Sequence, residues 1–248
     1  MKKSICLALA FTLIGAFSVS AQQNSFFIGF NGGANLSKFK YTRDLSNLYS
    51  TTSPVFGING GGIIGLEIQN FVLSIGLQYI QKGSIYETDT FEDEFGTGVY
   101  SATEKLHYIS IPLTLSYRKY LTDRFALTAG IGPSFNFGLG GKIDESTEYF
   151  GEEDVETTNY KVKFGNGVNE DYKGMQVGFQ FMVGMVYAIN NDSKLTFNVT
   201  WDSDTADAFN RRYKNANTFF DDYRGDQMNR STVFTIGYER HFSFGDRY

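Results

Sequence analysis

Hydrophobic and polar residues alternate along most of the chain after residue 25. The clearest run is 173–189, where large apolar side chains occupy the odd positions and Gln, Gly and Ala occupy most of the even ones. Successive side chains of a strand point to opposite faces. The run therefore predicts a strand with one apolar face and one small or polar face.

The same alternation predicts eight strands in all. They are residues 26–37, 55–68, 71–82, 104–118, 125–141, 173–189, 194–202 and 231–244. A typical globular strand has about 5–6 residues, whereas a tilted strand that crosses a membrane needs about 9–11. Several of the predicted strands are longer than ten residues, so their length favours a membrane protein.

The connections between these strands alternate in length. Three are short, at 69–70, 119–124 and 190–193, and four are long, at 38–54, 83–103, 142–172 and 203–230. An even number of antiparallel strands with short turns at one end and long loops at the other is the layout of an outer-membrane barrel. We therefore predict an all-β fold, an eight-stranded antiparallel up-and-down transmembrane β-barrel with long extracellular loops.

The composition of the polar face agrees with this prediction. It carries Gly, Ser, Thr, Asn and Gln with few charges, which suits a narrow lumen, while the apolar face suits lipid. A closed barrel also pairs every backbone group, as hydrocarbon requires. The alternative is a soluble periplasmic β-barrel binder, a sandwich or lipocalin-like protein that buries the apolar face and exposes the other.

Two prolines do not fit a regular barrel. Pro112 and Pro133 fall inside predicted strands, and a closed barrel has no edge strand to accommodate them. Pairing around the 119–124 turn places both at a similar level, so we predict one shared irregularity there, a β-bulge. The alternative is that the strand limits differ from those predicted.

The first 21 residues predict a secretory signal peptide. Lys2 and Lys3 precede an apolar run, and Val19-Ser20-Ala21 forms a small-residue cleavage site. We expect residues 22–248 to form one outer-membrane barrel domain. The single cysteine lies inside the predicted leader, so no disulfide or cysteine metal site is expected. Of the 22 basic residues, 20 then remain against 27 acidic ones, a balance that argues against nucleic acid as a partner.

Short motifs resemble a known family. The segment 108–113 (YISIPL), the segment 130–133 (GIGP) and the opening 29–35 (GFNGGAN) are similar to the PorT-type outer-membrane β-barrel family of Bacteroidota. The resemblance covers nearly the whole expected mature chain and implies an eight-stranded barrel in the outer membrane. A named member of that family takes part in protein secretion. The sequence contains no residues that we can assign to such a role.

One group of residues could support hydrolysis. Glu239, His241 and Ser243 lie on one face of the last predicted strand, and outer-membrane lipid A deacylases use a His-x-Ser pair with a carboxylate. However, these residues are expected at the periplasmic end and in the lumen, and Phe244-Gly245 departs from the pattern of those enzymes. We therefore predict no catalysis and keep a lipid-modifying enzyme as the alternative.

Charged residues are expected inside the barrel. Glu67, Arg118 and Glu239 point inward near the same end and are candidates for an internal ion-pair plug. The alternative is a proton or ion path. Side chains roughly fill the interior of an eight-stranded barrel, so we predict a plug and a filled lumen.

The loop 203–230 is the best candidate for contact with a partner. Arginine and aromatic residues are enriched at interfaces, and arginine binds phosphate, so this loop could contact a protein or a lipopolysaccharide phosphate. The alternative is a loop that folds over the barrel mouth. The residues concerned are Arg211, Arg212, Tyr213, Phe219, Phe220, Tyr223 and Arg224.

The acidic loops show no calcium-loop spacing, so we predict no metal site and no cofactor. The predicted function is therefore a structural or interaction role, exerted through the extracellular loops. The expected partners are outer-membrane lipid, lipopolysaccharide and other envelope proteins, and the expected oligomeric state is a monomer.

Overall fold

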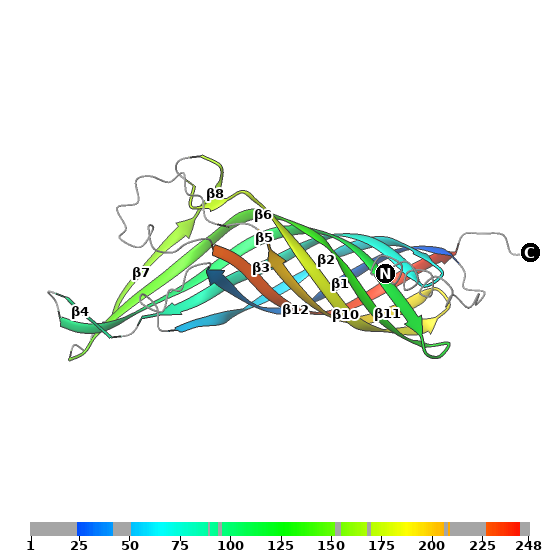
Figure 1. Cartoon of the computed structure of the whole chain (residues 1–248), viewed down its shortest axis with the longest axis horizontal. Coiled ribbons are helices and arrows are strands. Elements are labelled where there is room, and N and C mark those ends of the chain that lie inside the picture. The colour runs from blue at the N-terminus through cyan, green and yellow to red at the C-terminus, as the bar shows by residue number, and fades with distance from the viewer. Residues whose placement is uncertain are drawn as a thin grey trace, which may run out of the picture.

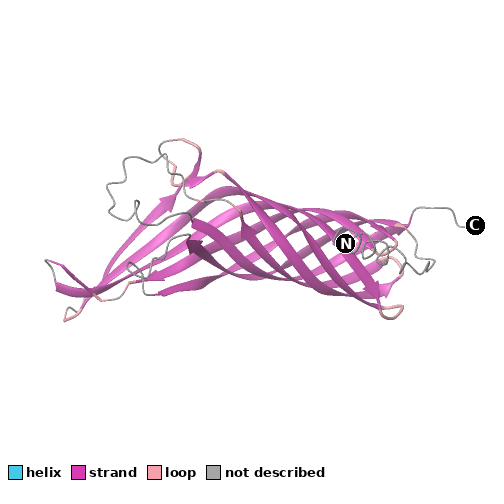
Figure 2. Ribbon diagram, in the orientation of Figure 1, coloured by secondary structure: helices cyan, strands magenta, loops and turns pink. Residues whose placement is uncertain are grey.

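The computed structural model describes residues 24–41, 51–88, 90–93, 96–151, 155–167, 170–205, 208 and 227–243. Strands make up nearly all of this part of the chain (Figures 1 and 2). No helix within these ranges is long and apolar enough to cross a membrane. The predicted signal peptide, residues 1–21, lies outside the described residues.

Eight long strands form a closed ring. They are β1 Ser25–Tyr41, β2 Thr51–Ile68, β3 Phe71–Glu87, β5 Gly96–Tyr120, β6 Phe125–Tyr149, β10 Met175–Asn190, β11 Ser193–Asp204 and β12 Gln227–Ser243. Each pairs antiparallel with the next along the chain, and β12 pairs with β1 over its whole length. The predicted eight-stranded antiparallel barrel is confirmed. Short turns join β2 to β3, β5 to β6 and β10 to β11 at one end, the short-turn end.

The opposite end, the long-loop end, contains further strands that the sequence did not predict. They are β4 Phe91–Asp93, β7 Val155–Val162, β8 Phe164–Gly165 and β9 Tyr172–Lys173. β4 pairs with β5 and β7 with β6, so the sheet continues beyond the ring (Figure 1, left). Parts of the predicted loops 83–103 and 142–172 are therefore strand. These segments are rich in polar residues and glycine and carry few large apolar side chains, so they lack the alternation on which the prediction depended.

The large apolar side chains point away from the barrel axis. They form an exposed apolar belt around the ring, whose members include Phe30, Phe56, Leu77, Leu139, Phe179 and Ile236. Inward positions such as Asn35 and Asn136 are fully buried. A soluble β-barrel binder or sandwich would bury the apolar face, so the structure overturns that alternative.

The two prolines do not cause a bulge. Pro112 lies opposite Ser134, and the β5–β6 ladder resumes at Leu115 in the same register. The missing amide groups thus interrupt the ladder without shifting the strands. The bulge lies elsewhere, between His107 and Tyr108, where β6 carries one extra residue beside Gly140, whose φ is 153°.

The outer half of the lumen is more apolar than the sequence predicted. A buried cluster fills it, formed by Phe39, Ile80, Tyr86, Ala102, Leu106, Tyr108, Ile143, Val162, Tyr172, Ala208 and Val233. The bulge accounts for part of this difference. On β6 the inward positions are even-numbered at Ser134 and Asn136 but odd-numbered at Ile143, because the extra residue reverses the alternation.

Candidate functional site

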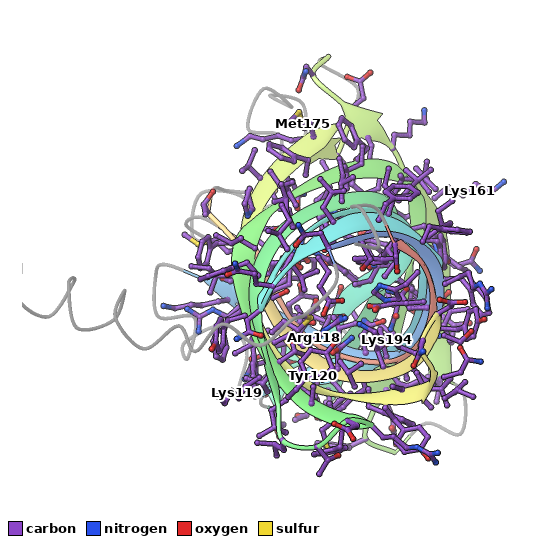
Figure 3. The ribbon with its side chains drawn as sticks, turned by 90° about the vertical axis from the view of Figure 1, so that its right-hand side faces the viewer. Arg118, Lys119, Tyr120, Lys161, Met175 and Lys194 are labelled. Carbon is purple, nitrogen blue, oxygen red and sulfur yellow. The ribbon has the colours of Figure 1, made fainter. Side chains whose placement is uncertain are left out.

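The three predicted lumen residues meet at the short-turn end. Arg118, near the end of β5, donates from Nη1 to Glu67 Oε2 at 2.8 Å. Its Nη2 donates to both carboxylate oxygens of Glu239, at 3.2 and 3.1 Å. All three residues are 3% exposed, so this is a fully buried bridge from β5 to β2 and β12. Figure 3, viewed from this end, shows Arg118 inside the ring.

Three further residues, not predicted as part of this plug, complete the cluster. Lys194 Nζ donates to Glu67 Oε2 at 2.7 Å and to the Tyr120 hydroxyl at 2.6 Å. The Tyr120 hydroxyl donates to Glu67 Oε1 at 2.7 Å, and His241 Nε2 lies 3.0 Å from Glu239 Oε2. We call this cluster the inner ion-pair layer. Its two basic side chains, Arg118 and Lys194, match its two carboxylates in number, and buried charges are tolerated when they are paired in this way.

A second buried cluster, the middle ion-pair layer, lies nearer the long-loop end. Lys82 Nζ is 2.6 Å from Asp202 Oδ2 and 3.7 Å from Asp204 Oδ1. Ser134 donates to Asp202, and the side-chain amides of Asn136 and Asn229 donate to Asp204. The sequence offered one signal for this cluster, because alternate positions on a strand place both aspartates on the same face.

The segment that contains β8 and β9 folds into the long-loop end of the lumen. The Tyr172 hydroxyl donates to Glu104 Oε2 at 2.9 Å, and the Tyr86 hydroxyl donates to the same oxygen at 3.0 Å. Phe164 packs edge-on against Tyr108 with ring centroids 5.2 Å apart. We call this group, with the buried apolar cluster, the outer cap.

A cavity of about 100 Å³ lies between the inner and middle layers. Hydroxyl and amide side chains dominate its lining. Asn31 Oδ1, Thr128 Oγ1, Asn198 Oδ1 and Arg118 Nε line it and have no hydrogen-bond partner among the described residues. A larger open vestibule of about 660 Å³ lies on the other side of the inner layer, at the short-turn end.

The possible hydrolytic group differs from the predicted one. His241 Nδ1 lies 2.9 Å from Ser25 Oγ, while Nε2 faces Glu239. The predicted serine, Ser243, is exposed at the end of β12. Ser25 is therefore the hydroxyl that contacts the imidazole. Glu239 is shared with Arg118, so the same atoms serve the ion-pair layer.

The predicted arginine and aromatic residues of loop 203–230, namely Arg211, Arg212, Tyr213, Phe219, Phe220, Tyr223 and Arg224, lie outside the described residues. Ala208 is described and is fully buried. Its amide donates to the Gln227 carbonyl, and its carbonyl accepts from the Lys173 amide. In the described ranges, no group of three or more His, Cys, Asp or Glu residues is placed to hold a metal ion.

A match to a protein family agrees with this fold. Residues 20–200 match the profile of the family described as "Outer membrane protein beta-barrel domain". No protein with a curated description matches the chain. Among solved structures, the Neisserial surface protein A (NspA) is 14% identical with a TM-score of 0.46, over 89% of this chain and 100% of that chain.

Two further structures are similar. Ail of Yersinia pestis, solved with the heparin analogue sucrose octasulfate, is 9% identical with a TM-score of 0.38, over 89% of this chain and 100% of that chain. The outer membrane protease OmpT from Escherichia coli is 13% identical with a TM-score of 0.36, over 88% of this chain and 97% of that chain. At these identities and TM-scores, none of the three likenesses assigns an activity to this chain.

Proposed function

This chain belongs to the outer membrane protein β-barrel domain family and is located in the bacterial outer membrane; on that premise we propose a structural or interaction role without catalysis. The role is exerted through the long-loop end, which faces the cell exterior in barrels with short periplasmic turns. The partners are outer-membrane lipid, lipopolysaccharide and other envelope proteins, and the protein is a monomer.

The observation that carries this proposal is the obstruction of the lumen at three levels. The inner ion-pair layer, the middle ion-pair layer and the outer cap follow one another along the barrel. Breaking a buried ion pair by removing one partner costs about 3–5 kcal/mol, because the remaining charge is left buried and unpaired. A lumen obstructed in this way supports a closed barrel over a pore.

The sheet beyond the ring supports an interaction role. β5 and β6 continue past the apolar belt, and β4 and β7 add to their edges (Figure 1). Residues Val155 to Lys161 of β7 are all exposed. These strand segments lie beyond the apolar belt, so they are available for contacts outside the membrane.

The motifs of the sequence support a finer assignment, to the PorT-type barrels of Bacteroidota. The segments 108–113 and 130–133 lie on β5 and β6 and face each other around the proline level of one ladder. We also propose that residues 1–21 are a signal peptide removed on export. The intact mass of the protein purified from membranes tests this cleavage, since a mass that includes residues 1–21 contradicts it.

Conductance in planar lipid bilayers tests the closed lumen. We expect no sustained single-channel steps from the folded protein, with folding checked by the heat-dependent shift of barrel mobility on a gel. Sustained large steps from folded protein contradict the proposal. For the interaction role, we expect envelope partners to co-purify with the intact protein and to be lost when residues 209–226 are deleted.

A second candidate function is lipid modification, which the Ser25–His241–Glu239 arrangement favours. In this candidate His241 Nδ1 would accept the proton of the Ser25 hydroxyl, the base–nucleophile pairing that hydrolases use. Replacing Ser25 with alanine, and Ser243 with alanine as a control, leaves the mass of lipid A unchanged if the proposed role is correct. A shift in lipid A mass with Ser25→Ala alone supports the enzyme instead.

A further inference from the structure

Basic residues lie directly opposite one another on the outward face of the barrel at the long-loop end. Lys105 on β5 pairs in register with Lys142 on β6, and Lys142 pairs with Lys161 on β7. We call these three residues the lysine row. Lys38 on β1 pairs with Arg230 on β12 in the same manner. All five side chains are exposed.

These like-charge pairs destabilise the sheet unless an anion lies between them. Residues directly opposite in an antiparallel ladder have Cβ atoms roughly 4.5–5.5 Å apart, and like charges at that distance are destabilising. The composition does not account for them, because the chain has 27 acidic residues and only 22 basic ones. The ladders of the described residues nevertheless contain three base–base pairs and no acid–acid pair.

The protein neutralises little of this charge. Lys142 contacts Asp144 Oδ1 at 2.5 Å, and both side chains are about half exposed. The other four bases form no ion pair with any of the described residues. An exposed pair of this kind contributes about 0–1 kcal/mol, so one such pair compensates the three bases of the row only in part.

The position of these bases fits the boundary of the membrane. On β1, Lys38 lies two positions beyond Leu36, which belongs to the exposed apolar belt. On β5, the next outward residues from Lys105 toward the short-turn end are His107 and Ile109. A strand advances about 3.3 Å per residue, so Lys38 lies roughly 7 Å along β1 from Leu36, and Lys105 lies roughly 13 Å along β5 from Ile109. Figure 3 shows Lys161 outside the ring, in contrast to Arg118 and Lys194 within it.

We propose that the lysine row and the Lys38–Arg230 pair bind the phosphate groups of lipopolysaccharide in the outer leaflet. A phosphate between two opposed ammonium groups turns their repulsion into two favourable ion pairs, and an arginine adds a bidentate contact. The apolar belt below them holds the acyl chains of the same lipid. The inference rests on the proposed lipopolysaccharide partner, and it assigns that partner to folded strands instead of the 203–230 loop.

The test compares two double variants in neutral detergent micelles. Lys105→Gln with Lys161→Gln removes the ends of the row and leaves the Lys142–Asp144 pair intact. Lys119→Gln with Arg124→Gln is the matched control, because both residues are exposed at the short-turn end and neither opposes another base. The readout is the melting temperature with and without lipid A.

Without lipid A, the row variant should melt about 1–3 °C higher than the wild type, because the repulsion is gone. With lipid A, the order should reverse, and the row variant should bind lipid A roughly fivefold more weakly. The control variant should follow the wild type in both conditions. The variant with Lys105→Arg and Lys161→Arg keeps both charges, so it should bind lipid A as the wild type does.

Three results overturn the proposal. They are equal loss of lipid A binding in the control variant, equal stabilisation of the wild type by dephosphorylated lipid A, and equal stabilisation by inorganic phosphate. Lys38→Gln with Arg230→Gln gives a second, independent measurement on the β1–β12 side and should behave like the row variant. None of these measurements depends on the lumen, so conductance or a catalytic Ser25 would refute the proposed function without affecting this inference.

Discussion

Lys194 lies directly opposite Glu239 in the β11–β12 ladder, yet its ammonium group bonds to Glu67, on β2. Glu239 is occupied by Arg118 and His241, so the adjacent carboxylate is already satisfied. The contact therefore crosses the lumen instead of following the sheet. As a result, the inner ion-pair layer links side chains of four strands, β2, β5, β11 and β12. The backbone ladders link each strand only to its two neighbours in the ring.

Replacing Arg118 with glutamine should strongly destabilise the barrel. Glu67 and Glu239 would lose their shared cation while remaining buried, and such a break costs about 3–5 kcal/mol. Urea unfolding in lipid bilayers measures the loss. The adjacent Lys119 is an exposed, outward-facing control, and Lys119→Gln should stay within about 0.5 kcal/mol of the wild type. An equal loss of unfolding free energy in the two variants would contradict a stabilising role for the buried ion pairs of Arg118.

The middle layer should behave as a coupled unit. Lys82→Met leaves Asp202 and Asp204 without their cation, so we expect a loss of about 3–5 kcal/mol. Adding Asp202→Asn should restore part of the stability, because one of the two uncompensated charges is then removed. A double-mutant cycle from urea unfolding should give a coupling of at least about 1 kcal/mol. Strictly additive effects would mean that the two side chains do not interact.

Two neighbouring glycines of β1 should differ in their tolerance of a side chain. A Cβ atom at Gly33 would collide with the backbone carbonyl of Phe234, whereas at Gly32 its nearest neighbour would be 3.7 Å away. Gly33→Ala should therefore cost about 1–3 kcal/mol by forcing β1 and β12 apart. Gly32→Ala should be close to neutral. The fraction of folded barrel on a gel, measured against urea, distinguishes the two variants.

The outer cap depends on a buried tyrosine. Tyr172→Phe removes the hydroxyl that donates to Glu104, and leaving that carboxylate with one donor fewer should cost about 1–3 kcal/mol. Tyr187, which is exposed on the apolar belt, is the control, and Tyr187→Phe should have little effect. Hydrogen exchange of the β9 amides should also rise in the Tyr172 variant alone. Unchanged exchange would show that the cap does not depend on this contact.

The sequence was sufficient to predict the ring because lipid imposes a strict alternation on every crossing strand. The same alternation predicted that Glu67, Arg118 and Glu239 face the lumen near the same end of the barrel. It could not identify Lys194 as their partner, because the partner is chosen across the lumen and not along a ladder. Likewise, it could not pair Lys82 with Asp202, since these residues lie near the ends of predicted strands on opposite sides of the barrel.

Where lipid is absent, the pattern lost its predictive value. The extensions of β5 and β6 beyond the belt carry few large apolar side chains, so the sequence pattern predicts loops there. The bulge beside Gly140 reversed the alternation of β6, which concealed Ile143 as a lumen residue. At Pro112 and Pro133 the sequence predicted a bulge, and the structure instead keeps the register of the two strands. The prolines interrupt hydrogen bonding at one level, but the strands on both sides are long enough to keep the register.

The seam between the first and last strands constrains how the protein is made. β1 pairs with β12 from Ser25–Ser243 to Tyr41–Gln227, so the N-terminal strand finds its second neighbour only in the final strand of the ring. Contacts of such high sequence separation form slowly, because the intervening chain must first be ordered. The barrel therefore cannot close before β12 is available to pair with β1. The ring is complete only when both ends of the described chain are side by side, from Ser25–Ser243 to Tyr41–Gln227.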